Sequence, residues 1–222
     1  MTKVFVHEIE KLKRKILSLS AQVEENVVQA VKALITRDPE LAKQVIESDM
    51  DIDRQEVEVE EEALKILALY QPVAMDLRFL TTVLKINNDL ERIGDLAANI
   101  AKRARKLCKE SEVPVPEELE VAALKARDMV RNSLTAFVNL DAELANTVRE
   151  ADDEVDDLCR QVFVFVANAG EKDPSRLSIY LTMLLASRNL ERIGDHATNI
   201  AEDIIYLIDG VIVRHPALDE ED

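Results

Sequence analysis

Hydrophobic side chains recur every three or four positions along the first part of the chain. The stripe comprises Ile9, Leu12, Ile16, Leu19, Val23, Val27, Ala30 and Leu34. This spacing puts all of them on one face of a helix, so it predicts an amphipathic helix over about residues 4–36. The segment Thr36-Arg37-Asp38-Pro39-Glu40 then supplies a cap-like polar residue and a proline suited to a first helical turn. A short helix is therefore predicted over PELAKQVIES, residues 39–48.

A longer helix is predicted over about residues 50–70. It should end before Pro72, because a residue that precedes proline disfavours the α conformation. The next helix, about 73–107, carries its own apolar stripe, made of Phe79, Val83, Ile86, Leu90, Ile93, Ala97, Ile100 and Ala104. Two prolines in residues 111–116 then mark the clearest linker of the chain.

The second half repeats the first. LERIGDLAANIA at residues 90–101 recurs as LERIGDHATNIA at 190–201, and only two positions differ. The same plan predicts helices over about 117–138, 142–149, 152–169 and 174–207, with a break at Gly170 and Pro174. The chain is thus predicted to be all-α, with two tandem bundles of three long helices, each with one short connecting helix. The predicted units are an N-terminal bundle (1–110), a linker (111–116), a C-terminal bundle (117–210) and an acidic tail (211–222).

Composition narrows the function classes. Hydrophobic residues make up 47% of the 222 residues, whereas there are only 4 Gly and 6 Pro, which is typical of long helices and excludes a β-sandwich or barrel. The formal net charge of −16 disfavours nucleic acid as a partner. Cys108 and Cys159 form no CxxC motif, and no apolar run is long enough for a signal or a membrane span. A reduced, cytoplasmic location without direct membrane insertion is expected.

Acidic side chains occur in pairs spaced by four residues, which places each pair on one helix face. Glu91 and Asp95 form one such pair, Glu191 and Asp195 the other, and Asn99 and Asn199 follow one turn later. Each helix is preceded in sequence by a second acidic pair, Asp49 with Asp53 and Asp152 with Asp156. If these helices pack together, four carboxylates and an amide converge in each half. Such oxygen-rich sites suit Mg²⁺, Ca²⁺, Mn²⁺ or iron.

Two other interpretations stay open. Arg92 and Arg192 could neutralise neighbouring carboxylates, which would leave a metal-free helical scaffold. A di-iron carboxylate enzyme of the ferritin kind needs Glu-x-x-His pairs, but Gly94 and Gly194 stand where those histidines would be. A glycine inside a helix costs on the order of 1 kcal/mol relative to alanine, so both glycines indicate close approach of a helix or ligand, and helix packing is the preferred explanation. His196 is expected to be a packed or surface side chain.

These motifs together resemble the PhoU family of phosphate-uptake regulators. Two LERIGD blocks are each followed by A-x-N-I-A and preceded by D-x-x-I/V-D, with QPVAMDLR at 71–78 and YLIDGVIVRH at 206–215. The resemblance implies pseudo-symmetric three-helix bundles that hold a transition-metal cluster of iron or zinc, with Mg or Mn as other options. The implied first site comprises Asp49, Asp53, Glu91, Asp95 and Asn99. The implied second site comprises Asp152, Asp156, Glu191, Asp195 and Asn199.

The resemblance also implies a function without catalysis. The protein would be a cytoplasmic negative regulator, peripherally associated with the membrane, that links a phosphate ABC transporter to a phosphate-sensing histidine kinase. It would form a homo-oligomer such as a homodimer. QPVAMDLR has no close counterpart in the second half, where DPSR stands at 173–176, so any partner-binding role of that segment would belong to the first bundle alone.

Overall fold

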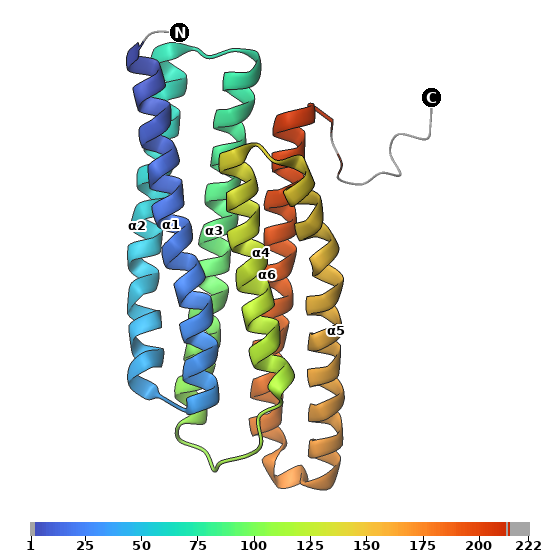
Figure 1. Cartoon of the computed structure of the whole chain (residues 1–222). Helices are drawn as coiled ribbons and strands as arrows, with labels where there is room; N and C mark the ends of the chain where they lie inside the picture. Colours follow the sequence, from blue (N-terminus) through green and yellow to red (C-terminus); the bar gives the residue numbers. More distant parts are fainter. Residues whose placement is uncertain (1–2, 212, 214–222) are drawn as a thin grey trace.

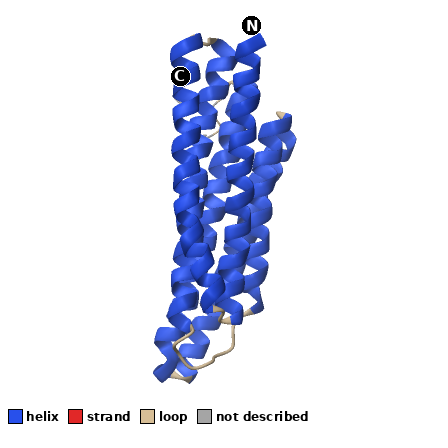
Figure 2. Cartoon of the chain, turned by 90° about the vertical axis from the view of Figure 1, so that its left-hand side faces the viewer, coloured by secondary structure: helices blue, strands red, loops and turns tan. Residues whose placement is uncertain are grey.

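Helices account for almost all of the structure. The computed structural model describes residues 3–211 and 213, and over these residues the chain forms six α helices, one short 3₁₀ turn at Pro174–Arg176 and no β strand (Figure 2). The helices are α1 (Lys3–Thr36), α2 (Pro39–Tyr70), α3 (Ala74–Leu107), α4 (Glu117–Asn139), α5 (Ala142–Lys172) and α6 (Leu177–Asp209). The predicted all-α class is confirmed.

The second helix of each half starts in the same way. The Asp38 carboxylate accepts hydrogen bonds from the backbone N–H groups of Glu40 and Leu41, both at 3.0 Å, and Asp141 accepts one from Leu144 at 2.9 Å. These side chains satisfy donors that the first helical turn leaves without a partner. The capping role expected of the residues before Pro39 is therefore confirmed.

The predicted short connecting helices are wrong. Residues 39–48 and 50–70 form one continuous helix, and so do residues 142–149 and 152–169. Neither junction contains a proline or glycine, so nothing interrupts the hydrogen-bond ladder. The helix α5 also continues through Gly170, where an added Cβ would lie 2.8 Å from Leu177 Cδ1. Gly170 thus permits close packing and does not end the helix.

The six helices lie side by side with their axes roughly aligned, and they form two three-helix bundles (Figure 1). The first bundle is α1, α2 and α3, and the second is α4, α5 and α6. The central helices α3 and α6 pack against each other, α1 packs against α4, and α2 and α5 lie on the two outer sides. The acidic motifs are therefore carried by the α2–α3 pair in one half and by the α5–α6 pair in the other.

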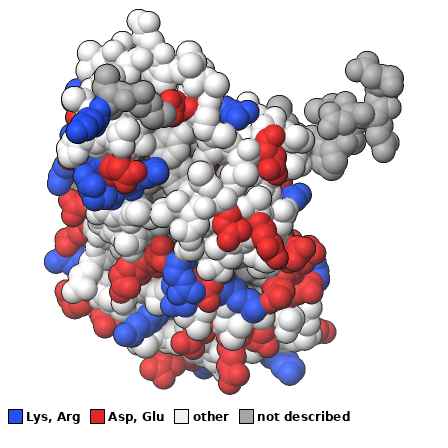
Figure 3. Space-filling view, turned by 45° about the horizontal axis from the view of Figure 1, so that its top comes forward, with Lys and Arg blue, Asp and Glu red and all other residues white. Residues whose placement is uncertain are grey.

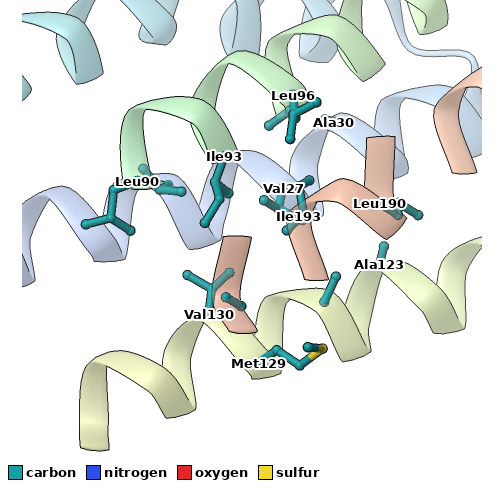
Figure 4. Packing of buried hydrophobic residues seen from close by; sticks show 14 of the residues in the cluster. Val27, Ala30, Leu90, Ile93, Leu96, Ala123, Met129, Val130, Leu190 and Ile193 are labelled. Atoms are coloured by element: carbon teal, nitrogen blue, oxygen red, sulfur yellow. The ribbon is translucent and has the colours of Figure 1, made fainter. Parts of the chain in front are cut away.

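One hydrophobic core extends through both halves. Leu90 and Ile93 of the first repeat and Leu190 and Ile193 of the second are fully buried, and they gather with α1 and α4 side chains such as Val27 and Val130 (Figure 4). Burying one such side chain contributes about 1.5–3 kcal/mol, so the repeated stripe stabilises both the bundles and their junction.

Polar contacts also cross the junction between the halves. His196 Nδ1 lies 2.9 Å from Asp89 Oδ1, and Lys85 Nζ lies 3.0 Å from Asp203 Oδ1. His196 is thus a packed, hydrogen-bonded side chain, as expected, and it does not join the acidic motifs. None of the helices within residues 3–209 combines the length and the hydropathy of a membrane span. Of the predicted acidic tail, residues 212 and 214–222 lie outside the described residues.

Candidate functional site

The first acidic set lies where α2 crosses α3 at Gly94. A Cβ added to Gly94 would lie 3.1 Å from two carbons of the Ile52 side chain and 3.8 Å from Asp49 Oδ1. The absence of a side chain therefore lets α2 come close to α3 and brings Asp49 over the helix that carries Glu91 and Asp95. The preference for helix packing as the explanation of this glycine is confirmed.

The second acidic set repeats this crossing between α5 and α6. A Cβ added to Gly194 would lie 2.9 Å from Asp152 Oδ1 and 3.7 Å from Val155 Cγ1. Asp152 and Val155 thus take the places that Asp49 and Ile52 hold in the first half. The two predicted acidic pairs of each half are brought to neighbouring helices, as the spacing indicates.

Burial and mutual repulsion raise the pKa values of several of these carboxyl groups. Burial is the main cause of the raised pKa of Asp49, and the charges of Asp95 and Asp53 add to it. The pKa of Glu91 is raised by burial, an effect that Arg92 opposes and that Asp95 and Asp53 reinforce. The acidic groups of α2 and α3 therefore interact electrostatically across the crossing.

The shift is larger in the second half. Burial raises the pKa of Asp152 to about 6, and the charges of Asp195 and Asp156 contribute to the rise. The pKa of Asp156 is raised as well, by burial and then by the charge of Asp195. The Thr198 hydroxyl lies close enough to Asp152 to oppose the shift. Three carboxylates from two helices thus share one region of negative potential.

The same aspartate oxygen is left without a partner in both halves. Asp49 Oδ1 and Asp152 Oδ1 are buried atoms that receive no hydrogen bond of normal geometry from any described residue, and the nearby Thr198 hydroxyl also lacks such a partner. A buried carboxylate oxygen without a donor is costly unless a cation or a proton satisfies it. Both atoms lie beside the crossing glycine, so the unsatisfied oxygens are equivalent features of the two repeats.

The remaining predicted ligands lie at the edges of these crossings. Asp53 and Asp195 are exposed, whereas Asp95, Asp156, Glu91 and Glu191 are half-buried. Asn99 and Asn199 follow one turn further along α3 and α6, and both are half-buried. Among the described residues, no three Asp, Glu, His or Cys side chains are arranged closely enough to hold a metal ion. Metal binding at either set would therefore require carboxylate side chains to turn inward.

Arg92 supports the ion-pair interpretation in the first half. Its guanidinium lies 3.3 Å from Glu91 Oε2 and 3.6 Å from Asp95 Oδ2. No ion pair joins Arg192 to an acidic side chain in the part of the chain that the structure describes. The two halves thus differ in how their carboxylates are neutralised.

Two side chains beside the acidic sets were not among the predicted site residues, Glu56 in the first half and Cys159 in the second. In the first half, Asn87 Nδ2 donates to Glu56 Oε1 at 2.8 Å and to the Glu56 carbonyl at 2.9 Å. In the second half, Cys159 takes the place of Glu56, and its thiol donates to the Ser187 carbonyl at 3.2 Å. The only sequence signal for this pairing is that Glu56 lies three residues after Asp53 and Cys159 three residues after Asp156.

Comparison with known proteins gives the same division of the chain. The family model for the PhoU domain matches residues 16–104 and again residues 119–204. The chain belongs to the PhoU family. The two matches cover α1–α3 and α4–α6 respectively, and each includes one complete acidic set.

Full-length relatives extend this family assignment. The chain is 42% identical over 215 residues to a phosphate-specific transport system accessory protein PhoU homolog of Pseudomonas putida, covering 96% of this chain and 84% of that protein. It is 32% identical to the phosphate-specific transport system accessory protein PhoU of Escherichia coli, covering 98% and 90%.

Solved structures show the same fold. The crystal structure of PhoU from Pseudomonas aeruginosa is similar with a TM-score of 0.89 and 41% identity, over 93% of this chain and 100% of that one. The phosphate transport system regulatory protein PhoU of Streptococcus pneumoniae is similar with a TM-score of 0.84 and 28% identity, over 94% and 99%. Pairs of three-helix bundles are therefore shared within this PhoU group. These relatives are named as accessory or regulatory proteins, not as enzymes.

Proposed function

We propose that this PhoU-family chain is a metal-binding negative regulator of phosphate uptake and phosphate-starvation signalling. It acts without catalysis, in the cytoplasm, as an adaptor between a phosphate ABC transporter and a sensor histidine kinase. The names of its relatives, which are phosphate transport accessory and regulatory proteins, support the phosphate role. The proposed form is a homo-oligomer, in the simplest case a homodimer.

The observation that carries the metal proposal is the pair of unpartnered oxygens, Asp49 Oδ1 and Asp152 Oδ1, at equivalent crossings. The donors around them are carboxylates and one asparagine amide, a set that suits hard cations such as Mg²⁺, Mn²⁺ or iron better than zinc. A bound cation would supply positive charge that offsets the burial and the mutual repulsion that raise the pKa values of Asp49 and Asp152. The residues that would hold it are Asp49, Asp53, Glu91, Asp95 and Asn99 in one half and Asp152, Asp156, Glu191, Asp195 and Asn199 in the other.

Elemental analysis of protein purified without chelator tests this proposal. The comparison variant carries Glu91→Ala, Asp95→Ala, Glu191→Ala and Asp195→Ala, and its helix content is checked by circular dichroism. We expect transition metal at or above one ion per half in the wild type and a loss of nearly all of it in the folded variant. Equal and negligible metal in both proteins would overturn the metal assignment.

The partner surface belongs to the end of the molecule where α2 passes into α3. Leu69, Val73 and Met75 are exposed there, Val73 to 74%. Figure 3 shows an uncharged region at the very top of this face, with basic and acidic groups below it. An uncharged, exposed surface of this kind suits contact with a protein partner.

A binding experiment tests the adaptor role. Membranes containing the phosphate transporter, or the isolated kinase, are incubated with metal-loaded and chelator-treated protein. We expect capture of the loaded protein and weaker capture after chelation. Val73→Asp with Met75→Asp should abolish capture without changing metal content. Unchanged affinity after chelation would show that metal has no regulatory role in the contact.

A metal-free scaffold remains a second candidate, because Arg92 already neutralises two carboxylates in the first half. In that case the two crossings would be structural, and the phosphate role would depend on the partner surface alone. The elemental analysis distinguishes the two candidates. The second crossing is the more informative one, since Glu191 and Asp195 form no such ion pair among the described residues.

A further inference from the structure

A pocket of about 190 Å³ opens between α5 and α6, next to the second acidic set. Two arginines, two carboxylates, a thiol and an aromatic ring line it, namely Arg160, Arg188, Asp156, Glu191, Cys159 and Phe163. Asp156 and Glu191 belong also to the acidic set, so the pocket extends that set along the groove. Its charged lining is balanced, with two positive and two negative side chains.

Both arginines can turn toward a ligand at little cost. Arg160 forms an ion pair with Asp157, but both side chains are mostly exposed, so this pair contributes little to stability. Arg188 is exposed and takes part in no ion pair or hydrogen bond within the described part of the chain. Guanidinium groups present a planar set of donors that matches the oxygens of phosphate, sulfate or carboxylate.

The two carboxylates restrict which anion can enter. An ionised Asp or Glu accepts hydrogen bonds but donates none, so it repels an anion that has no proton. An oxyanion with an O–H group can donate to the carboxylates while its other oxygens accept from the arginines. Inorganic phosphate keeps at least one proton at neutral pH, whereas sulfate keeps none. The thiol does not compete, because Cys159 already donates to the Ser187 carbonyl at 3.2 Å.

The first half provides an internal contrast. Counting along α2 from Asp53 and along α5 from Asp156, Val57 corresponds to Arg160 and Glu60 to Phe163. Counting back from Glu91 and Glu191, Asn88 corresponds to Arg188. The equivalent groove of the first half therefore has no arginine at these positions and two more carboxylates, Glu56 in place of Cys159 and Glu60 in place of Phe163, and it should exclude anions.

We propose that the α5–α6 pocket binds inorganic phosphate in a protonated form. Arg160 and Arg188 donate to its oxygens, and Asp156 and Glu191 accept from its O–H. This inference rests on the proposed phosphate-regulatory function for its biological role, because it makes the second half the part that responds to phosphate itself. Its chemistry does not require metal. A cation at the second acidic set would instead weaken the repulsion and increase the affinity.

Isothermal titration calorimetry of the full chain with phosphate, at neutral pH after chelator treatment, tests the proposal. We expect one phosphate per chain, with sulfate and a phosphate monoester dianion binding at least about 10-fold more weakly. Arg160→Gln with Arg188→Gln should weaken phosphate binding by at least about 10-fold. The control Arg54→Gln with Arg131→Gln, which changes the net charge equally at exposed positions, should leave it unchanged.

Three results would overturn the inference: no phosphate binding by the chelated protein, equal affinity for sulfate, or full binding by the pocket variant. Anion binding that occurs only in metal-loaded protein, with phosphate and sulfate alike, would assign the anion to the metal and also overturn it. The proposed function is judged separately by metal content and partner capture. Protein that binds metal and its partners but not phosphate would contradict the pocket assignment alone.

Discussion

The two acidic crossings share a backbone frame but differ in their surroundings. At both, a glycine of the central helix lies beneath an aspartate with an unpartnered oxygen. Around the first, Arg92 pairs with Glu91 and Asp95. Around the second, a buried thiol and two pocket arginines are found instead. Duplication of the helical unit has thus kept the positions of the carboxylates and changed the groups that neutralise them.

This difference has an electrostatic consequence. The pKa of Asp152 is raised to about 6, mainly by burial and then by Asp195 and Asp156. In the first half, Lys102 opposes the raised pKa of Asp49, and Arg92 opposes that of Glu91. The second crossing therefore holds the carboxyl group whose pKa is raised furthest, and it gains more from a cation at neutral pH.

The largest effect should come from removing carboxylates in one half at a time. Asp152→Asn with Asp195→Asn, and separately Asp49→Asn with Asp95→Asn, should each remove the metal of the altered half. We expect an affinity loss of at least about 100-fold there, because even indirect contacts to a metal are worth about 10–100-fold. Elemental analysis should show about half the wild-type metal in each variant.

Asp51→Asn with Asp153→Asn is the matched control for these variants. Both residues are exposed neighbours of the acidic pairs on α2 and α5, so the change in charge is the same. Metal content should stay at the wild-type value. A uniform loss of metal in all three variants would mean that net charge, not the crossings, governs binding.

Alanine substitutions at the two crossing glycines should distinguish effects on helix packing from effects on the geometry of the acidic site. A Cβ at Gly94 meets the fully buried Ile52 side chain at 3.1 Å, whereas a Cβ at Gly194 meets the end of Asp152 at 2.9 Å. We expect Gly94→Ala to lower the free energy of unfolding by about 1–2 kcal/mol, since Ile52 has no room to move. Gly194→Ala should change it by less than about 0.5 kcal/mol, because Asp152 can rotate and helix propensity improves.

Urea unfolding and metal titration of the two variants check this contrast. Gly194→Ala should bind metal more weakly although its stability is preserved, because Asp152 is displaced from the crossing. Equal destabilisation by both substitutions would show that the Asp152 side chain is as firmly packed as Ile52.

The sequence was sufficient to predict the helices and the acidic sets, but it did not predict every connection. Three sequence signals have a direct structural meaning: apolar positions every three or four residues, a cap-like polar residue before Pro39, and the duplicated LERIGD block. The junction near Asp49 was less clear, because acidic residues interrupt the apolar stripe there without breaking the helix. A continuous apolar stripe indicates burial, whereas a continuous helix depends on backbone hydrogen bonds, and the junction near Asp49 contains no proline that would remove one.

The pocket could not have been found in the sequence. Arg160 and Arg188 are 28 residues apart on different helices, and both have the spacing of ordinary exposed side chains. Only the packing of α5 against α6 brings them to one groove. Likewise, the spacing of the carboxylates predicts that they share a crossing but not how far each side chain turns inward, because rotamers depend on contacts that the sequence pattern does not contain.

A smaller effect should appear in the pH dependence of stability. The pKa of Asp152 in the folded protein, about 6, lies above its ordinary value of 3.8, so the folded state holds this proton more tightly than the unfolded chain. The contribution of Asp152 to stability is therefore present below about pH 4 and is lost as the pH rises through about 6. Asp152→Asn should gain on the order of 1 kcal/mol relative to wild type between pH 4 and pH 7.5, after allowance for solvent around this half-exposed group.

Chemical denaturation of the metal-free proteins at both pH values measures this gain. Asp153→Asn, at an exposed position beside Asp152, should show no comparable change. If Asp152→Asn followed the wild-type pH profile, the carboxyl group would be better solvated than its place beside Gly194 indicates.

The smallest effect distinguishes the ion-pair scaffold from the metal site. Arg92→Gln frees Glu91 and Asp95, whose distances to the Arg92 guanidinium are 3.3 and 3.6 Å. An exposed pair of this kind is worth about 0.2–1 kcal/mol, so stability should fall only slightly while metal affinity in the first half rises by about 2- to 5-fold at low salt. Arg192→Gln should leave the stability and the metal affinity of the second half unchanged, because Arg192 forms no ion pair with a carboxylate among residues 3–211.

Metal titrations of both variants at low and high salt measure the effect of Arg92→Gln, which should diminish as salt screens the ion pair. A larger loss of stability than gain in affinity would instead mean that Arg92 is the intended counter-charge of the first crossing, and that only the second is built to take a cation.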